Sequence, residues 1–145
     1  MTYDDKHNSP EGLEGRALLE RFRQSAHAAR IKLVANKAVI SEKELITALG
    51  EAQWQDLNAA IQAGRLFTVE IDGVQYFPAF YAAPGLDRVQ LERILQALQG
   101  LSGWIKWVFL TTPKGSLSDL TPLEALKKPG MFEDVLSAAD GFAER

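Results

Sequence analysis

Side chains suited to acid–base, nucleophilic or metal chemistry are few in this sequence. Cysteine is absent, which removes thiol nucleophiles, disulfides and thiolate metal sites. The two histidines, His7 and His27, lie far apart along the chain and make no site. Glu133 and Asp134 are neighbours in a segment expected to be helical, so their carboxylates point about 100° apart and cannot form a catalytic pair. Motifs that cradle phosphate, bind zinc or activate a serine are also absent. We therefore expect a protein that is not an enzyme and uses no metal or cofactor.

Composition and charge narrow the class of protein further. With 46% hydrophobic residues over 145 positions, the chain can bury a core without disulfides or metal. The polar N-terminus lacks the pattern of a secretory signal, and no apolar run is long enough to span a membrane, so we expect a cytoplasmic protein. The net charge is −3, but residues 16–43 carry +5 and residues 44–145 carry −5. The basic stretch is either a solvated helix face or a surface for an anionic partner such as DNA.

Helical patterns follow the polar lead-in, residues 1–10, which we expect to be disordered. From about residue 11 to residue 30, apolar residues recur three and four positions apart and predict one helix: Leu13, Ala17, Leu18, Phe22, Ala26 and Ala29. Ser41 and Glu44 then form a capping-box pattern, which predicts the start of a helix that ends at Gly50. A further helix is expected from about Ala52 to Ala63.

A β-hairpin is predicted next. Residues 66–71 and 74–80 are rich in β-branched and aromatic side chains, and only Asp72 and Gly73 separate them. Asp-Gly favours the type I′ turn because both of its central residues need positive φ. Pro78 lacks an amide proton, so the second strand should lie on an edge or end there. The order helix, turn, helix, hairpin resembles the compact winged helix-turn-helix of excisionase-like and MerR-like DNA-binding domains.

The helix-turn-helix reading identifies seven candidate DNA-binding residues. Amide side chains on the second short helix are candidates for reading base edges, and basic side chains around it are candidates for phosphate contacts: Gln53, Gln55, Asn58, Arg30, Lys32, Lys37 and Arg65. Phosphate would repel Glu51 and Asp56, and that helix contains no lysine or arginine. The alternative is a helix-turn-helix scaffold kept for folding or dimerisation.

The C-terminal part is expected to be helical, after a linker at residues 82–86. One helix includes Val89 to Leu98, and Ser102 is placed to cap another that runs to Leu110. Residues 112–120 are expected to be a loop. Thr121, Pro122 and Glu124 form a second capping box with proline at the first helical position, and a final helix spans about residues 131–142.

Trp104 and Trp107 are three positions apart and share one face of the predicted helix. Tryptophans at such spacing usually belong to a core. If one of them is partly exposed, it is a natural anchor for a protein partner, because aromatic side chains carry much of the binding energy at interfaces. Both interpretations remain open from the sequence.

The segment from Gly85 to Arg145 resembles a known family, the Xre/MbcA/ParS-type antitoxin toxin-binding domain. In that family a helical pair carrying a tryptophan leads through a proline-containing loop to a TPLE-type helix and a closing helix. The residues that carry the resemblance are Trp104, Trp107, Phe109, Leu110, Thr111, Thr112, Pro113, Leu117, Thr121, Pro122, Leu123, Glu124, Ala125, Leu126, Val135, Ala138 and Ala139.

This resemblance implies a stoichiometric inhibitor of a protein toxin, such as a NAD-degrading toxin of the RES type, that acts without a cofactor and assembles as a homo-oligomer. The partner-binding positions that it implies are Trp104, Trp107, Pro113, Leu117, Thr121, Pro122 and Leu126. Several of these must also determine the fold.

We therefore expect a mostly α protein, a helix-turn-helix with a β-hairpin wing followed by a C-terminal four-helix toxin-binding-like domain. The expected divisions are a tail at 1–10, the helix-turn-helix-like module at 11–81 and the toxin-binding-like domain at 82–145. A DNA-binding transcriptional regulator is the alternative function.

Overall fold

The computed structural model describes residues 10–144, with side chains from Glu14 onward, and most of the expected tail lies outside these residues. The chain divides into two compact units, one up to Lys37 and one from Ala38 onward. The expected division at residues 81 and 82 falls within the second unit and stays a prediction.

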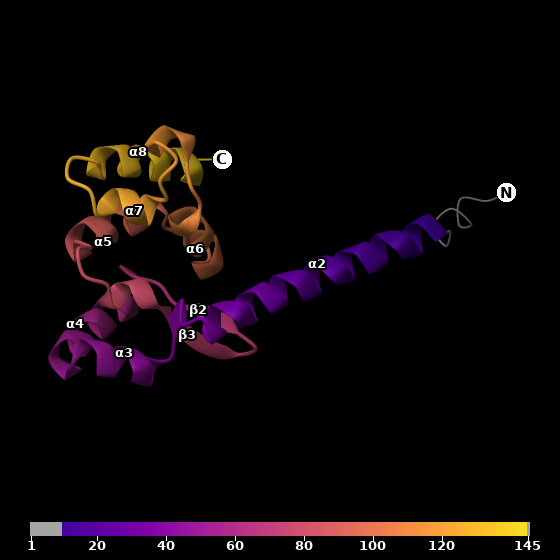
Figure 1. Cartoon of the computed structure of the whole chain (residues 1–145), viewed down its shortest axis with the longest axis horizontal. Helices are drawn as coiled ribbons and strands as arrows, with labels where there is room; N and C mark the ends of the chain where they lie inside the picture. Colours follow the sequence, from indigo (N-terminus) through magenta and orange to yellow (C-terminus); the bar gives the residue numbers. More distant parts are fainter. Residues whose placement is uncertain (1–9, 145) are drawn as a thin grey trace. The chain divides into compact units, whose positions relative to one another are not determined.

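The described part of the first unit is dominated by one long helix, α2 (Pro10–Ala35) (Figure 1). It extends five residues beyond the predicted end at Arg30, because residues 31–35 contain no glycine or proline to stop it. The chain then turns at Lys37, whose φ is +64°. Leu18, Leu19 and Phe22 of this helix are exposed.

The second unit begins with a short strand and two helices, β1 (Val39–Ile40), α3 (Glu42–Leu49) and α4 (Glu51–Gln62). The predicted capping box is confirmed: the Glu44 amide donates to Ser41 Oγ at 3.1 Å, and the Ser41 amide donates to Glu44 Oε1 at 3.1 Å. Gly50, with φ of +87°, joins the two helices. That backbone conformation explains glycine at the junction.

The hairpin is also confirmed, but its strands are shorter than the predicted 66–71 and 74–80: they are β2 (Val69–Ile71) and β3 (Val74–Pro78), because η1 begins directly after Pro78. Asp72 and Gly73 have φ of +52° and +81°, as a type I′ turn requires. The strand β3 also pairs with β1, which gives a three-stranded antiparallel sheet in the order β1-β3-β2. The sequence did not predict β1, because two residues are too few for an alternating pattern. Pro78 stands at the end of the central strand, so its missing amide proton breaks no ladder.

The remainder of the unit is helical. It comprises η1 (Ala79–Ala82), α5 (Arg88–Ala97), α6 (Gly103–Thr111), η2 (Gly115–Leu117), α7 (Pro122–Leu126) and α8 (Phe132–Ala143). The second capping box is confirmed, with the Glu124 amide 3.1 Å from Thr121 Oγ1 and the Thr121 amide 2.8 Å from Glu124 Oε1. The hydrogen bond from the Thr121 amide holds the pKa of the exposed Glu124 carboxyl below its usual range. Between α6 and α7 the expected loop contains η2 and an isolated bridge from Lys114 to Leu120.

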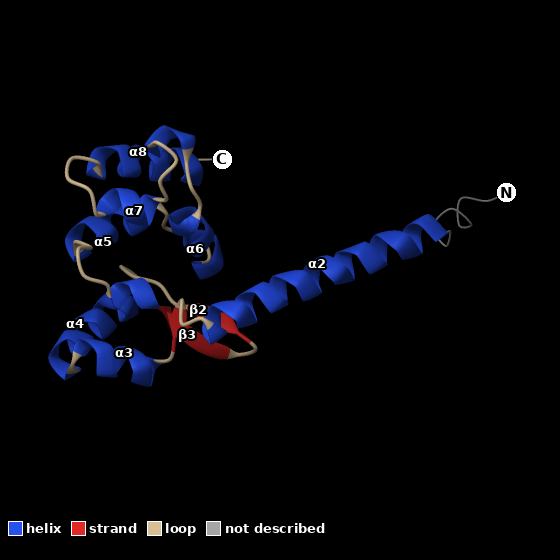
Figure 2. Ribbon diagram, viewed as in Figure 1, coloured by secondary structure: helices blue, strands red, loops and turns tan. Residues whose placement is uncertain are grey.

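These elements make the described chain mostly helical with one small sheet (Figure 2). Helix α8 packs against α5 and α7, and α7 also packs against α6. The core between them contains fully buried side chains from each segment: Ile94, Leu98, Phe109, Leu110, Leu117, Ala125, Val135 and Ala139. Within residues 10–144, none of the helices combines the length and apolar character needed to cross a membrane.

Candidate protein-binding surface

Helix α6 carries apolar residues on every side. Phe109 and Leu110 are fully buried against the core, and Trp104 and Trp107 are half-buried. Ile105 and Val108 point the other way and remain 43% and 52% exposed. A helix that is apolar all round normally has both faces covered. On α6 one of these faces has no cover in the described chain.

The start of α6 lies very close to the hairpin. A Cβ atom at Gly103 would overlap the carbonyl oxygen of Thr68, so only glycine fits this position without a shift of the backbone. Immediately after it, Trp104 Nε1 donates a hydrogen bond to the carbonyl oxygen of Glu70 at 2.9 Å. The hairpin therefore fixes the position and rotation of α6.

A row of aromatic rings continues from α6 to η1. Trp104 and Trp107 meet edge to face with centroids 6.4 Å apart, and Trp107 stacks on Phe80 at 6.0 Å. Behind them, the Tyr81 hydroxyl donates to the Phe67 carbonyl at 2.6 Å and accepts from the Phe67 amide at 2.7 Å. Burial raises the pKa of Tyr81 far above its ordinary value, so the hydroxyl stays protonated. The two tryptophans thus lie within an internal cluster and also border the exposed side of α6.

We define the outer face of α6 as Ile105, Val108 and Thr112, which share one side of the helix at spacings of three and four. Thr112 Oγ1 donates to the Val108 carbonyl at 2.6 Å, which leaves its methyl group as additional apolar surface. Lys106 lies at least 100° around the helix from these residues, and its partial burial lowers its pKa below the ordinary lysine value. The outer face of α6 is therefore apolar and contains no formal charge.

The implied partner-binding residues fall into two groups in the structure. Trp104 and Trp107 are partly accessible on α6, and Pro113 is exposed just after that helix. By contrast, Leu117, Pro122 and Leu126 are buried, and Thr121 caps α7. The residues of the second group therefore stabilise the packing of the C-terminal helices.

Ile105 and Val108 were not among the residues singled out from the sequence. A signal for them was present, because Gly103–Thr111 contains more large apolar side chains than one helix face can bury.

The seven DNA-binding candidates are divided between the two units. Arg30, Lys32 and Lys37 belong to the first unit. In the second unit Gln53 and Gln55 are exposed on α4, Asn58 is half-buried, and Arg65 pairs with Glu92 at 3.4 Å. The exposed side of α4 also carries Glu51 and Asp56. Within the second unit these candidates do not form a basic surface.

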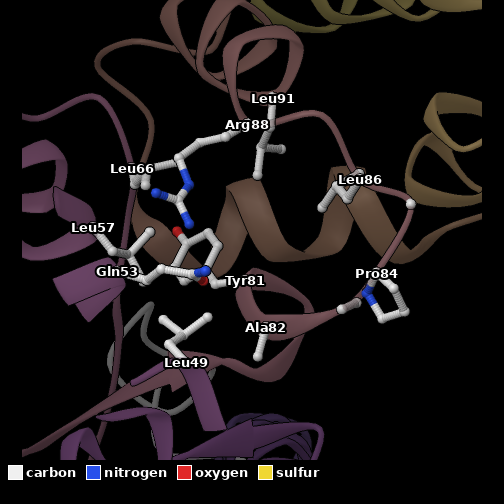
Figure 3. A pocket seen from close by; sticks show the side chains of 12 residues that line it. Leu49, Gln53, Leu57, Leu66, Tyr81, Ala82, Pro84, Leu86, Arg88 and Leu91 are labelled. Carbon is white, nitrogen blue, oxygen red and sulfur yellow. The ribbon is translucent and has the colours of Figure 1, made fainter. Parts of the chain in front are cut away.

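A cavity of about 520 Å³ opens where α4 faces the start of α5 (Figure 3). The figure shows leucines on its walls and the polar side chains of Gln53, Tyr81 and Arg88 turned toward its interior. Residues 82–86, the expected linker, form one side of it. Among the side chains that the structure describes, no group of three or more His, Asp or Glu residues is placed to hold a metal ion.

The chain matches no family model, and neither curated proteins nor solved structures gave a significant match. The resemblance to the antitoxin toxin-binding domain therefore depends on the sequence between Gly85 and Arg145 alone.

Proposed function

We propose that this chain is an antitoxin-like cytoplasmic protein that binds and inhibits a partner toxin through its C-terminal helices, α5 to α8. The observation that carries the proposal is the uncovered outer face of α6. Inhibition of this kind requires a complementary surface and no reacting group, which agrees with the absence of catalytic motifs in the sequence. In this assignment α5 to α8 form the four-helix toxin-binding-like domain.

The energetics favour a protein partner for the outer face of α6. Removing apolar surface from water stabilises a complex by roughly 25 cal/mol per Å². Ile105 and Val108 are already held on a rigid helix, so covering them costs little conformational entropy. Trp104 and Trp107 lie next to them, and partly exposed tryptophans are frequent anchors at interfaces. The resemblance adds the class of partner, a toxin such as one of the NAD-degrading RES type.

The test is a pull-down of the full chain with the product of the neighbouring gene, followed by rescue of growth when that product is toxic. Val108→Glu should abolish capture and rescue, because it places a charge in the apolar contact. Gln55→Glu makes the same change in charge on the exposed side of α4 and should leave both unchanged. If Val108→Glu still binds and rescues, the outer face of α6 is not the toxin-binding surface.

A DNA-binding regulator is the second candidate, and the sheet supplies the observation in its favour. The pairing order β1-β3-β2, with α3 and α4 between β1 and β2, is the arrangement found in winged helix-turn-helix domains. In that assignment α4 would be the recognition helix and the Asp72–Gly73 hairpin the wing. The acidic residues on α4 oppose it, since a recognition helix lies against phosphates.

Salt dependence of binding tests this second candidate. If Arg30, Lys32 and Lys37 contact phosphates, replacing all three with alanine should reduce the slope of log affinity against log salt by roughly three units. A gel-shift titration at several salt concentrations measures that slope. An unchanged slope, or no shift of duplex DNA at low salt, would contradict the DNA-binding candidate and leave protein binding as the remaining proposal.

A further inference from the structure

None of the described side chains of helix α2 is buried. It has 26 residues, and every side chain from Glu14 to Ala29 is exposed. Arg23 and Glu20 form an ion pair at 3.4 Å, but both side chains are exposed and such pairs stabilise little. Gly15 lies within the helix and disfavours it. Because most helical stability in proteins comes from packing an apolar face, a surface that covers α2 is required.

One side of α2 carries small and apolar residues with a gradient of size, whereas Ile31 and Val34 lie on other sides of the helix. At 100° per residue, seven of these small and apolar residues fall within about one third of the helix circumference. We call them the α2 stripe: Gly15, Leu18, Leu19, Phe22, Ala26, Ala29 and Leu33. Large side chains occupy its middle at positions 18, 19 and 22, and small ones follow at positions 26 and 29. Leu18, Leu19 and Phe22 are 45%, 56% and 61% exposed.

We propose that the α2 stripe pairs with the same stripe of a second copy of this chain, in antiparallel orientation and centred near Gln24. In that register Phe22 lies opposite Ala26 of the second copy, and Leu19 lies opposite its Ala29. Leu33 lies opposite its Gly15. At these three positions a large side chain meets a small one, which is the condition for close interdigitated packing, and Leu18 lies opposite Arg30 of the second copy.

Charge favours the same orientation. Residues 23–37 contain four basic residues and no acidic one, whereas residues 10–22 contain three acidic and two basic ones. Antiparallel pairing brings the basic half of each helix beside the half that holds the acids, with Glu14 near Lys32 of the second copy on the same flank. Parallel pairing would place two basic halves together and would set Ala26 against Ala26. Such a pairing is self-complementary about a two-fold axis, which singles out a second copy as the partner.

The first experiment is the molar mass of the full chain in solution, by sedimentation or light scattering. The proposal expects twice the chain mass of 16.0 kDa. Phe22→Glu should return the protein to a monomer, while Gln24→Glu, the same change in charge on the opposite side of α2, should leave the dimer intact. A monomeric wild-type chain would overturn the proposal, as would a Phe22→Glu variant that remains dimeric.

The second experiment tests orientation and exploits the absence of native cysteine. Single variants Leu19→Cys and Ala29→Cys are oxidised separately and as a mixture. Antiparallel pairing predicts an intermolecular disulfide only in the mixture, because each residue lies about 15 Å along the axis from its own copy. Disulfides formed within each single variant, and none specific to the mixture, would show parallel pairing and contradict the proposed register.

This inference is independent of the toxin-binding proposal, because it concerns a different helix. Phe22→Glu should still capture the toxin partner, whereas Val108→Glu should still form the α2 dimer. Failure of one proposal is therefore distinguishable from failure of the other.

Discussion

Helices α4 and α6 are held in similar ways and present opposite chemistry to their surroundings. Each uses a tryptophan to contact the hairpin: Trp54 of α4 meets Phe77 edge to face at 5.5 Å, and Trp104 of α6 bonds to the carbonyl of Glu70. The exposed side of α4 is polar and acidic. The outer face of α6 is apolar and contains no formal charge.

The comparison shows why the inner face of a helix is a poor guide to its function. The buried sides of both helices are apolar, and each contacts the hairpin through a tryptophan. Only the outer sides are free to differ, and here they favour different partners. Water solvates the exposed side of α4 adequately, while the outer face of α6 gains free energy when a protein covers it.

The largest expected effect concerns the attachment of α4. Trp54 is almost fully buried, so Trp54→Ala should lower the free energy of unfolding by about 3 to 5 kcal/mol. Trp54→Phe should cost much less, because it keeps an aromatic ring against Phe77. Urea unfolding followed by circular dichroism measures both. A loss below about 1 kcal/mol for the alanine variant would mean that Trp54 does not hold α4.

Adding a single methyl group at the start of α6 should lower the free energy of unfolding by nearly as much. Gly103→Ala forces the start of α6 away from Thr68 and should cost about 1 to 3 kcal/mol. Gly141→Ala, inside α8 and with open space around it, is the matched control and should stabilise by about 0.5 to 1 kcal/mol. Equal effects at the two glycines would contradict the close approach of α6 to the hairpin.

A smaller loss of stability is expected from the capping boxes of α7 and α3, the helices that pack on α6 and α4. Thr121 caps α7, which packs on α6, and Ser41 caps α3, which packs on α4. Thr121→Ala should lower stability by about 0.5 to 2 kcal/mol, and Ser41→Ala by a similar amount. An unchanged midpoint of thermal unfolding for either variant would remove the claim that its cap stabilises the protein.

The smallest expected effect is a pH dependence from Lys106 on α6. Its folded pKa lies below the ordinary lysine value, so between those two pKa values the unfolded chain binds more protons. The stability contributed through Lys106 should therefore rise as pH increases through its folded pKa toward 10.5, and level off above that. Subtracting the unfolding free energy of Lys106→Met, measured at the same pH values, isolates this rise. A flat difference would mean that Lys106 is fully hydrated.

Local signals in the sequence predicted many of the helix boundaries and the turn of the hairpin. Both capping boxes, the Asp72-Gly73 turn and proline at the start of α7 act within a few neighbouring residues, so their outcome does not depend on the rest of the chain. The strand β1 escaped prediction because its two residues form a strand only by pairing with β3. The length of α2 was underestimated because its last residues carry no strong helix signal.

Identifying the candidate site needed both the sequence and the tertiary structure. The sequence placed Trp104 and Trp107 on one helix and showed that the chain lacks the motifs of common enzymes. It did not separate residues that face the core, such as Leu117, from residues that face solvent, such as Val108. That distinction depends on which side of α6 packs against α7 and the hairpin, and those contacts come from other segments of the chain.

The sequence by itself determined where several helices start and end, where the chain reverses, and that no cysteine or paired histidine is present for chemistry. Tertiary structure alone decided which apolar side chains become core and which remain as surface. The physical reason is that burial is a property of packed elements. An apolar residue on a helix has the same local preference on either face, and only the neighbours that pack against that helix decide whether it is covered.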